Sequence, residues 1–371
     1  MRHQDRSLTR GRDETVETQP TRTRAAACRA HRPPRPHPPG RRLLIAAALL
    51  GLAIPFGAST SASAQAGSSA SSRAMSAYAS AAKLHAAIVA AQKASSPPGN
   101  VTPAISTLAA QKDWGGDLQN SSSCPALGES AASFALSSCT FGDTQSSTVI
   151  ALVGDSRAQM WLDTFNTLGL AEHFKLVLIA KSGCPVPLGV YQTNNLDGTV
   201  SAAPWSACTA FHSFIASSLA SLQPAAIVIS SNDELELADP SRSASPKVVA
   251  TDMAKFLKTL PASSAKVILG GFPQPAPTAS PTVCLSKGPK RISSCNFVPS
   301  SAVVADNAAV QTAAKAVGVG FINQTPWFCA STCPSIVASI IPYTIDGYHA
   351  DKTYLNYLTG VLWDSLKPYI H

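Results

Sequence analysis

The feature that most constrains the fold is an alternation, from about residue 147 onward, of short apolar runs with longer segments of helical spacing. The runs, rich in Val, Ile and Leu, are 149–153, 174–180, 225–230, 266–269 and 319–322. The helical segments are 157–168, 206–221, 247–260, 301–317 and 353–366. Continuous β-branched runs separated by helices predict a parallel sheet covered on both faces. We therefore expect a three-layer α/β/α sandwich with about five strands.

The chain upstream of this alternation divides into two further regions. Residues 1–66 form a basic leader, and residues 67–145 form an extension that we expect to be partly helical and tied by a disulfide. The helix is expected between residues 76 and 93, where Leu84, Ile88 and Val89 share one face with Tyr78. The third region, 146–371, is expected to be one domain that contains the whole alternation.

The leader has the order of features found in secretory signal peptides. Arg41-Arg42 precedes the apolar run 43–54, and small residues with two A-x-A sites follow at 62–66. At about a dozen residues the run is short for a membrane span, which needs roughly 20. We expect an exported protein, secreted or in the cell envelope, with the signal cleaved; retention of the run as an anchor is the alternative.

Positive charge is confined to the leader. Of the formal net charge of +8, residues 1–42 contribute +7, from eleven Arg, no Lys and four acidic residues. The remaining 329 positions are thus close to neutral. Because nucleic-acid binding requires a basic surface, we expect no nucleic-acid partner.

Cysteine usage agrees with export. Eight cysteines follow the leader, an even number that suggests disulfides in an exported chain. The expected pairs join sequence neighbours: Cys124–Cys139, Cys184–Cys208, Cys284–Cys295 and Cys329–Cys333. Zinc binding by the last pair is the rival interpretation, but no second Cys/His pair stands at a matching spacing. We expect no metal and no cofactor.

Two short stretches carry residues suited to nucleophilic catalysis. The first strand ends in Gly154-Asp155-Ser156, immediately before a helix, so Ser156 is either an exposed nucleophile or an ordinary residue of the helix cap. Asp346-Gly347-Tyr348-His349 lies before the last helix and places a carboxylate three residues from an imidazole. That pair is either the orienting acid and base of a catalytic triad or a polar turn.

With this chain order the sequence resembles the SGNH (GDSL-like) hydrolases. It is most similar to the extracytoplasmic SGNH domains fused to membrane acyltransferases that O-acetylate surface polysaccharides. The resemblance implies that Ser156 is the nucleophile, with His349 as base and Asp346 as its partner. It also implies an oxyanion hole formed by the backbone N–H groups of Ser156 and Gly183 and the side-chain amide of Asn232.

Two positions depart from the family pattern. Ser230 stands where glycine is usual in the block Ser230-Ser231-Asn232-Asp233, which puts the close backbone approach there, and with it Asn232, in question. Arg157 follows the nucleophile where the fused domains often have His. It is a weak candidate for binding an anionic or sugar substrate, and the favoured interpretation is an exposed side chain on the first helical turn.

The expected function is that of an exported serine esterase or O-acyltransferase acting on acyl esters, with acetyl expected, of cell-envelope carbohydrate. Hydrolysis and transfer use the same catalytic groups, so the sequence does not decide between them. The expected partners are an acylated sugar or polysaccharide and, for transfer, a separate membrane acyltransferase. The alternative is a catalytically silent carbohydrate-binding or envelope-structural module with the same fold.

Overall fold

The computed structural model describes residues 80–110, 136–194, 200–231, 245–275 and 280–370. They all belong to one compact unit within Ser59–His371. The leader expected at 1–66 lies outside the described residues. None of the described helices combines the length and apolar character needed to cross a bilayer.

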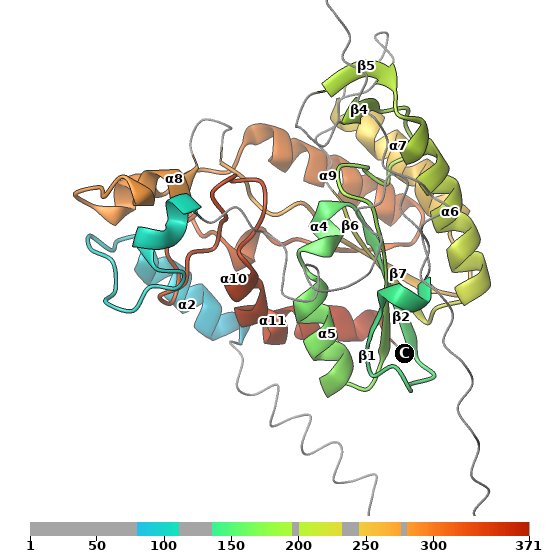
Figure 1. Ribbon diagram of the computed structural model, residues 1–371, viewed down its shortest axis with the longest axis horizontal. Coiled ribbons are helices and arrows are strands. Elements are labelled where there is room, and N and C mark those ends of the chain that lie inside the picture. Colours follow the sequence, from blue (N-terminus) through green and yellow to red (C-terminus); the bar gives the residue numbers. More distant parts are fainter. Residues whose placement is uncertain (1–79, 111–135, 195–199, 232–244, 276–279, 371) are drawn as a thin grey trace, which may run out of the picture. The chain divides into compact units, whose positions relative to one another are not determined.

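A six-stranded sheet forms the centre of this unit (Figure 1). Its strand order is β1-β3-β2-β6-β7-β8, and every neighbouring pair is parallel except β1 with β3. The strands are β1 Thr140–Gly142, β2 Val149–Gly154, β3 Lys175–Ala180, β6 Ala226–Ser230, β7 Ala265–Leu269 and β8 Gly320–Ile322. The five strands expected from the apolar runs are the five parallel ones.

Side chains alternate between the two faces of the sheet and build a separate core on each. On β2, Ile150 and Leu152 enter one core, whereas Ala151 and Val153 enter the other. All four are completely buried, which explains why the strands read as continuous apolar runs rather than as alternating patterns.

Helices cover both faces, so the three-layer α/β/α prediction is confirmed (Figure 1). Side chains of α2, α5, α10 and α11 pack into the first core, and those of α6, α7 and α9 into the second. The α-helices are α2 Ala81–Ala91, α4 Ser156–Gln159, α5 Leu162–Ala171, α6 Ser206–Leu222, α7 Pro246–Thr259, α8 Pro281–Ser286, α9 Ser301–Ala316, α10 Lys352–Tyr357 and α11 Thr359–Leu366. Short 3-10 helices are η1 Ile105–Ala110, η4 Leu136–Cys139, η5 Ile292–Cys295, η6 Thr325–Trp327 and η7 Lys367–Tyr369.

Three strands were not expected from the sequence. β1 adds an antiparallel edge to the sheet, and β4 Gln192–Asn194 pairs with β5 Val200–Pro204 in a separate two-stranded sheet. These strands are short and contain mostly small or polar residues, so no apolar run marks them. Because β1 lies at 140–142, the sheet begins before the boundary that we expected at residue 146.

The helix expected at 76–93 begins later, at Ala81, and its apolar face is narrower than expected. Leu84 and Ile88 are buried in the core next to the sheet, but Val89 is exposed. Tyr78 lies outside the described residues. The extension packs on the rest of the fold through Leu84 and Ile88 of α2 and also through Leu108, which joins a separate cluster with Leu285, Ile292 and Ile341.

Three of the four expected disulfides are present in the structure: Cys184–Cys208, Cys284–Cys295 and Cys329–Cys333. The fourth expected pair includes Cys124, which lies outside the described residues. The bond between Cys329 and Cys333 removes these thiolates as zinc ligands.

Candidate active site

The candidate nucleophile lies at the turn between β2 and α4. Gly154, the last residue of β2, sits directly against the backbone of β6, and a Cβ built on it would lie 1.8 Å from the Ser230 carbonyl oxygen. Only glycine fits this contact. Asp155 caps the helix, its Oδ1 accepting from the N–H of Arg157 at 2.8 Å. Ser156 is thereby the first residue of α4, where backbone N–H groups have no acceptor within the helix.

The candidate base lies on a loop just before α10. Gly347 allows the sharp reversal of this loop with a φ of +71°. Oδ1 of Asp346 accepts three hydrogen bonds, from Thr344 Oγ1 at 2.7 Å, Tyr348 N at 2.8 Å and His349 N at 3.0 Å. The loop is therefore a compact turn organised by one carboxylate oxygen.

The second oxygen of this carboxylate connects the loop to the nucleophile. Asp346 Oδ2 lies 2.7 Å from His349 Nδ1, and His349 Nε2 lies 2.9 Å from Ser156 Oγ. The structure thus brings together three side chains from two stretches 193 positions apart. With the proton on Nδ1 facing Asp346, Nε2 is the acceptor for the serine hydroxyl.

Burial of the imidazole favours its neutral form. The side chain of His349 is 13% exposed and that of Asp346 is 35% exposed. Burial is the largest cause and lowers the pKa of His349, and the positive charge of Arg157 lowers it further. The hydrogen bond to Asp346 and the negative charges of Asp346 and Asp155 oppose this shift. Burial raises the pKa of Asp346, but its hydrogen bond and charge interaction with His349 outweigh burial and hold the pKa well below its usual range. A neutral imidazole beside an ionised carboxylate is the state that a general base requires.

Arg157 is not on an exposed helix face, so the favoured sequence interpretation was wrong. Its side chain is 4% exposed, and the guanidinium lies 4.4 Å from the centroid of the Phe272 ring. The side-chain oxygen of Gln274, with the amide turned toward Arg157, accepts from the guanidinium. The helix turns this residue toward the loop after β7 rather than toward solvent, which tertiary packing alone decides.

Ser230 is compatible with the close approach that its departure from glycine put in question. The close contact is made by the Ser230 carbonyl with Gly154, not by the position of a Cβ on residue 230. The Ser230 hydroxyl donates to the Arg157 carbonyl at 3.3 Å, so the added side chain joins β6 to α4. Asn232 lies outside the described residues, and its expected role stays a prediction.

Gly183 lies on the loop after β3, at the same edge of the sheet as Ser156. Ala180 and Ser230 both pair with Gly154, so the carboxyl ends of β3, β2 and β6 are level with one another. Gly183 has a φ of +69°, and the N–H of Cys184 closes the turn onto the carbonyl of Lys181 at 3.0 Å. This is a turn whose third residue requires positive φ, which explains the glycine.

The remaining described histidines do not form a second site of this kind. His173 lies 3.4 Å from Asp143, but its side chain is 67% exposed. Nε2 of His212 lies 2.7 Å from the Pro185 carbonyl oxygen, and burial lowers the pKa of this imidazole. The two sulfur atoms near His212 belong to the disulfide Cys184–Cys208, so this cluster does not offer thiolates to a metal.

Two residues of the site were missed by sequence reasoning. The hydroxyl of Thr344 donates to the carboxylate of Asp346. A threonine two residues before an aspartate is a sequence signal that could have predicted this contact. Ser231 donates to Oδ2 of Asp155 at 3.3 Å. This contact has no sequence signal, because it joins residues 76 positions apart.

Several solved structures are similar to this chain. The chain is similar to the periplasmic domain of the Salmonella ser. Paratyphi A lipopolysaccharide acetyltransferase, with 13% identity, 61% of this chain and 85% of that chain covered, and a TM-score of 0.44. It is also similar to a GDSL-like lipase from Bacteroides thetaiotaomicron, with 15% identity, 60% and 88% covered, and a TM-score of 0.36. A lipase/acylhydrolase from Enterococcus faecalis has 12% identity, 60% and 97% covered, and a TM-score of 0.37.

No curated protein sequence matches the chain. Family membership therefore rests on the sequence model described as "SGNH domain (fused to AT3 domains)", which matches residues 123–360. That match spans well over half of the 371 residues and includes both stretches of the candidate site. The chain belongs to this SGNH family.

Proposed function

We propose that this chain is an exported serine ester hydrolase or O-acyltransferase that acts on acetyl esters of cell-envelope carbohydrate. The observation that carries the proposal is the continuous hydrogen-bonded series from Ser156 Oγ through His349 to Asp346. Membership of the SGNH family supports ester hydrolysis or acyl transfer as the reaction class.

In the proposed first half-reaction, Ser156 Oγ attacks the ester carbonyl carbon while its proton passes to His349 Nε2. Asp346 holds the ring orientation and stabilises the imidazolium that forms. The tetrahedral oxyanion is bound by the N–H groups of Ser156 and Gly183 and by the amide of Asn232. His349 then gives its proton to the departing alcohol, which leaves an acyl-serine.

In the second half-reaction an acceptor O–H takes the place of the departed alcohol. His349 accepts its proton as the acceptor oxygen attacks the acyl-serine carbonyl. The bond between the carbonyl carbon and Ser156 Oγ then breaks, and His349 returns the proton to Ser156 Oγ. Water as acceptor makes the protein an esterase, whereas a sugar hydroxyl makes it a transferase. The association of this family with AT3 domains supports a separate membrane acyltransferase as partner for the transferase.

Export is supported by the order of features in the leader and by the disulfides. Catalysis at a cell-envelope carbohydrate requires an extracytoplasmic location, so these two parts of the proposal depend on each other. Fractionation of cells that express the full chain, followed by immunodetection, tests the location. Detection only in the cytoplasm would overturn this part.

The catalytic proposal is tested with Ser156→Ala. We expect wild-type protein to be labelled by a fluorophosphonate and to hydrolyse a soluble acetyl ester, and the variant to lose the label and at least about 10⁴-fold in kcat. Ser217→Ala is the matched control, because Ser217 is an exposed serine of α6 whose hydroxyl donates to the Phe214 carbonyl of the same helix. It should retain both properties.

Wild-type protein that resists the fluorophosphonate and hydrolyses no acetyl ester would overturn the proposal in favour of the silent carbohydrate-binding module. If Ser156-dependent hydrolysis is present, an added oligosaccharide acceptor separates the two reactions. Acetylated oligosaccharide detected by mass spectrometry identifies a transferase, and free acetate alone identifies an esterase.

A further inference from the structure

The loop that carries Gly183 is attached to four different parts of the fold. The N–H of Lys181 donates to the carbonyl of Gly154 at the end of β2, and Ser182 Oγ donates to Gln159 of α4 at 2.6 Å. The other two attachments are made after Gly183 in the chain: Cys184 is bonded to α6, and Val186 is bonded to Ser231, the residue after β6. A short loop with this many anchors has little freedom to move relative to Ser156.

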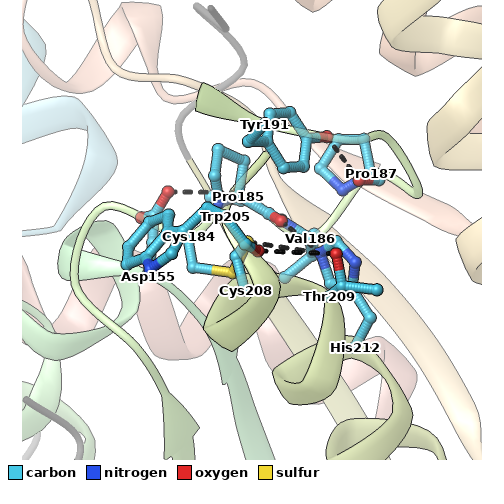
Figure 2. Close-up of a disulfide and its surroundings, with 11 residues drawn as sticks. Asp155, Cys184, Pro185, Val186, Pro187, Tyr191, Trp205, Cys208, Thr209 and His212 are labelled. Atoms are coloured by element: carbon cyan, nitrogen blue, oxygen red, sulfur yellow. Dashed lines mark hydrogen bonds between the residues drawn. A yellow bond between two sulfur atoms is a disulfide. The ribbon is translucent and has the colours of Figure 1, made fainter. Parts of the chain in front are cut away.

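The attachment to α6 is the disulfide Cys184–Cys208 (Figure 2). Cys184 is adjacent to Gly183, and Cys208 lies in the first turn of α6. One turn later on the same helix, His212 lies under the loop with Nε2 2.7 Å from the Pro185 carbonyl oxygen. Both cysteines are completely buried or nearly so. A covalent bond and a buried hydrogen bond thus hold successive residues of the loop to one helix.

The attachment to the residue after β6 is made by the Ser231 hydroxyl. Ser231 Oγ accepts from the N–H of Val186 at 3.1 Å and donates to Oδ2 of Asp155 at 3.3 Å. A hydroxyl has one proton to donate and lone pairs to accept with. Ser231 therefore connects the Gly183 loop to the residue that precedes the nucleophile, and Asp155 itself is buried.

We propose that the Cys184–Cys208 disulfide and the Ser231 hydroxyl are positioning groups that hold the Gly183 N–H at the distance from Ser156 that the oxyanion requires. This inference rests on the proposed function and deepens it. Neither group touches the reacting atoms; each acts through the backbone of residues 183–186. Because oxyanion donors act only when pre-aligned, loosening this loop lowers the rate of acylation while His349 and Asp346 stay in place.

The test compares Cys184→Ala/Cys208→Ala and Ser231→Ala with wild-type full-length protein. Active sites are titrated with a fluorophosphonate, and the acylation rate per titrated site is measured with a soluble acetyl ester. We expect the rate per site to fall about 10- to 100-fold in each variant, with little change in KM. A merely structural role would instead reduce the number of titratable sites and leave the rate of each site unchanged.

The matched control is Cys329→Ala/Cys333→Ala, which removes another buried disulfide that lies outside the loop 181–186. It should lower the unfolding temperature but keep the wild-type rate per site. If the Cys184/Cys208 variant fails to fold, Ser231→Ala carries the test, because it leaves every disulfide in place.

Variants at both positions that keep a rate per site within about twofold of wild type would overturn the positioning role, as would an equal loss in the Cys329/Cys333 control. Wild-type protein without any Ser156-dependent turnover is a different outcome, since it overturns the proposed function itself.

Discussion

The two loops that flank Ser156 are built in opposite ways. The loop 344–349 is organised mostly from within, because the Asp346 carboxylate accepts from a side chain two residues before it and from two backbone groups that follow it. An outside contact is added by the Ser280 hydroxyl, which donates to the Ile345 carbonyl at 3.1 Å. The loop 181–186 is instead organised from outside, by β2, α4, α6 and Ser231. The first loop is thus held mainly by its own groups, whereas the second, although it contains one turn hydrogen bond of its own, is held mainly by other parts of the fold.

Because of this difference, we expect substitutions to affect the two loops in different ways. A substitution within 344–349 should act on the acid–base chemistry directly, with small effects elsewhere. The loop 181–186 should respond to substitutions at residues far away in the sequence, such as Ser231. The three predictions below challenge the independence of the first loop, in order of decreasing effect.

The largest effect is expected from Asp346→Asn. The Asn oxygen can still accept from the N–H groups that Asp346 holds, so the loop should keep its shape. The amide cannot stabilise the imidazolium or hold the correct tautomer, so kcat should fall on the order of 10⁴-fold. Steady-state kinetics on a soluble acetyl ester, with circular dichroism to verify folding, measures this.

Asp143→Asn is its matched control, because Asp143 pairs with an exposed imidazole at 3.4 Å. It should leave kcat unchanged. A loss of less than about tenfold in Asp346→Asn would show that the carboxylate is not part of the base.

A smaller loss of activity, together with a loss of stability, is expected from Gly347→Ala. This substitution tests whether the positive φ at this position requires glycine. The φ of +71° disfavours any side chain, whereas the space for a Cβ is adequate, with Ser280 Cβ the nearest atom at 3.5 Å. The free energy of unfolding should fall by about 1–2 kcal/mol from the left-handed backbone alone. Urea denaturation measures this.

Gly318→Ala provides the comparison, since Gly318 has a φ of +70° with open space around it. It lies before β8, at the amino end of a strand, whereas the candidate site lies at the carboxyl ends. Both variants should lose similar stability, and only Gly347→Ala should also lose activity. Equal activity in the two variants would contradict a role for the backbone of this loop in aligning His349.

The smallest effect is expected from Arg157→Met, which tests whether α4 influences the loop electrostatically. The positive charge of Arg157 contributes to lowering the pKa of His349. Removing it should raise this pKa, so a higher pH is needed to keep the imidazole neutral. The acidic limb of the profile of kcat/KM against pH should therefore move to higher pH.

Arg157→Lys keeps the charge and should leave the acidic limb closer to its wild-type position. A limb that stays unmoved in Arg157→Met, or that moves to lower pH, would show that Arg157 has no electrostatic effect on the base. The substitution also removes the contact between the guanidinium and the Phe272 ring. That loss changes packing and not the proton affinity of His349, so it does not account for a shift of the acidic limb.

Much of the fold could be predicted because its signals are local. Apolar runs marked all five parallel strands, and helical spacing marked the long helices that cover them. The disulfides closed between sequence neighbours, and Asp346 and His349 met within one turn. Each of these features depends on residues close together in the chain, where periodicity and turn chemistry carry information.

The remaining features depend on which surfaces pack together, and local patterns do not contain that information. β1 is a strand because it pairs with β3. Arg157 is buried because Phe272 and Gln274 pack beside its guanidinium. Ser231 gained its role from Asp155 and Val186, each more than 40 positions away.

The sequence by itself determined the layers of the fold, because the spacing of apolar residues along the chain specifies them. It also suggested three disulfide pairs that the structure contains and the neighbouring Asp346 and His349. Only the tertiary structure decided that His349 reaches Ser156 across 193 positions and that the Gly183 loop is held beside them. The physical reason is that a hydrogen bond requires two atoms within about 3 Å. Packing of both cores against the sheet sets that distance, and no local sequence pattern does.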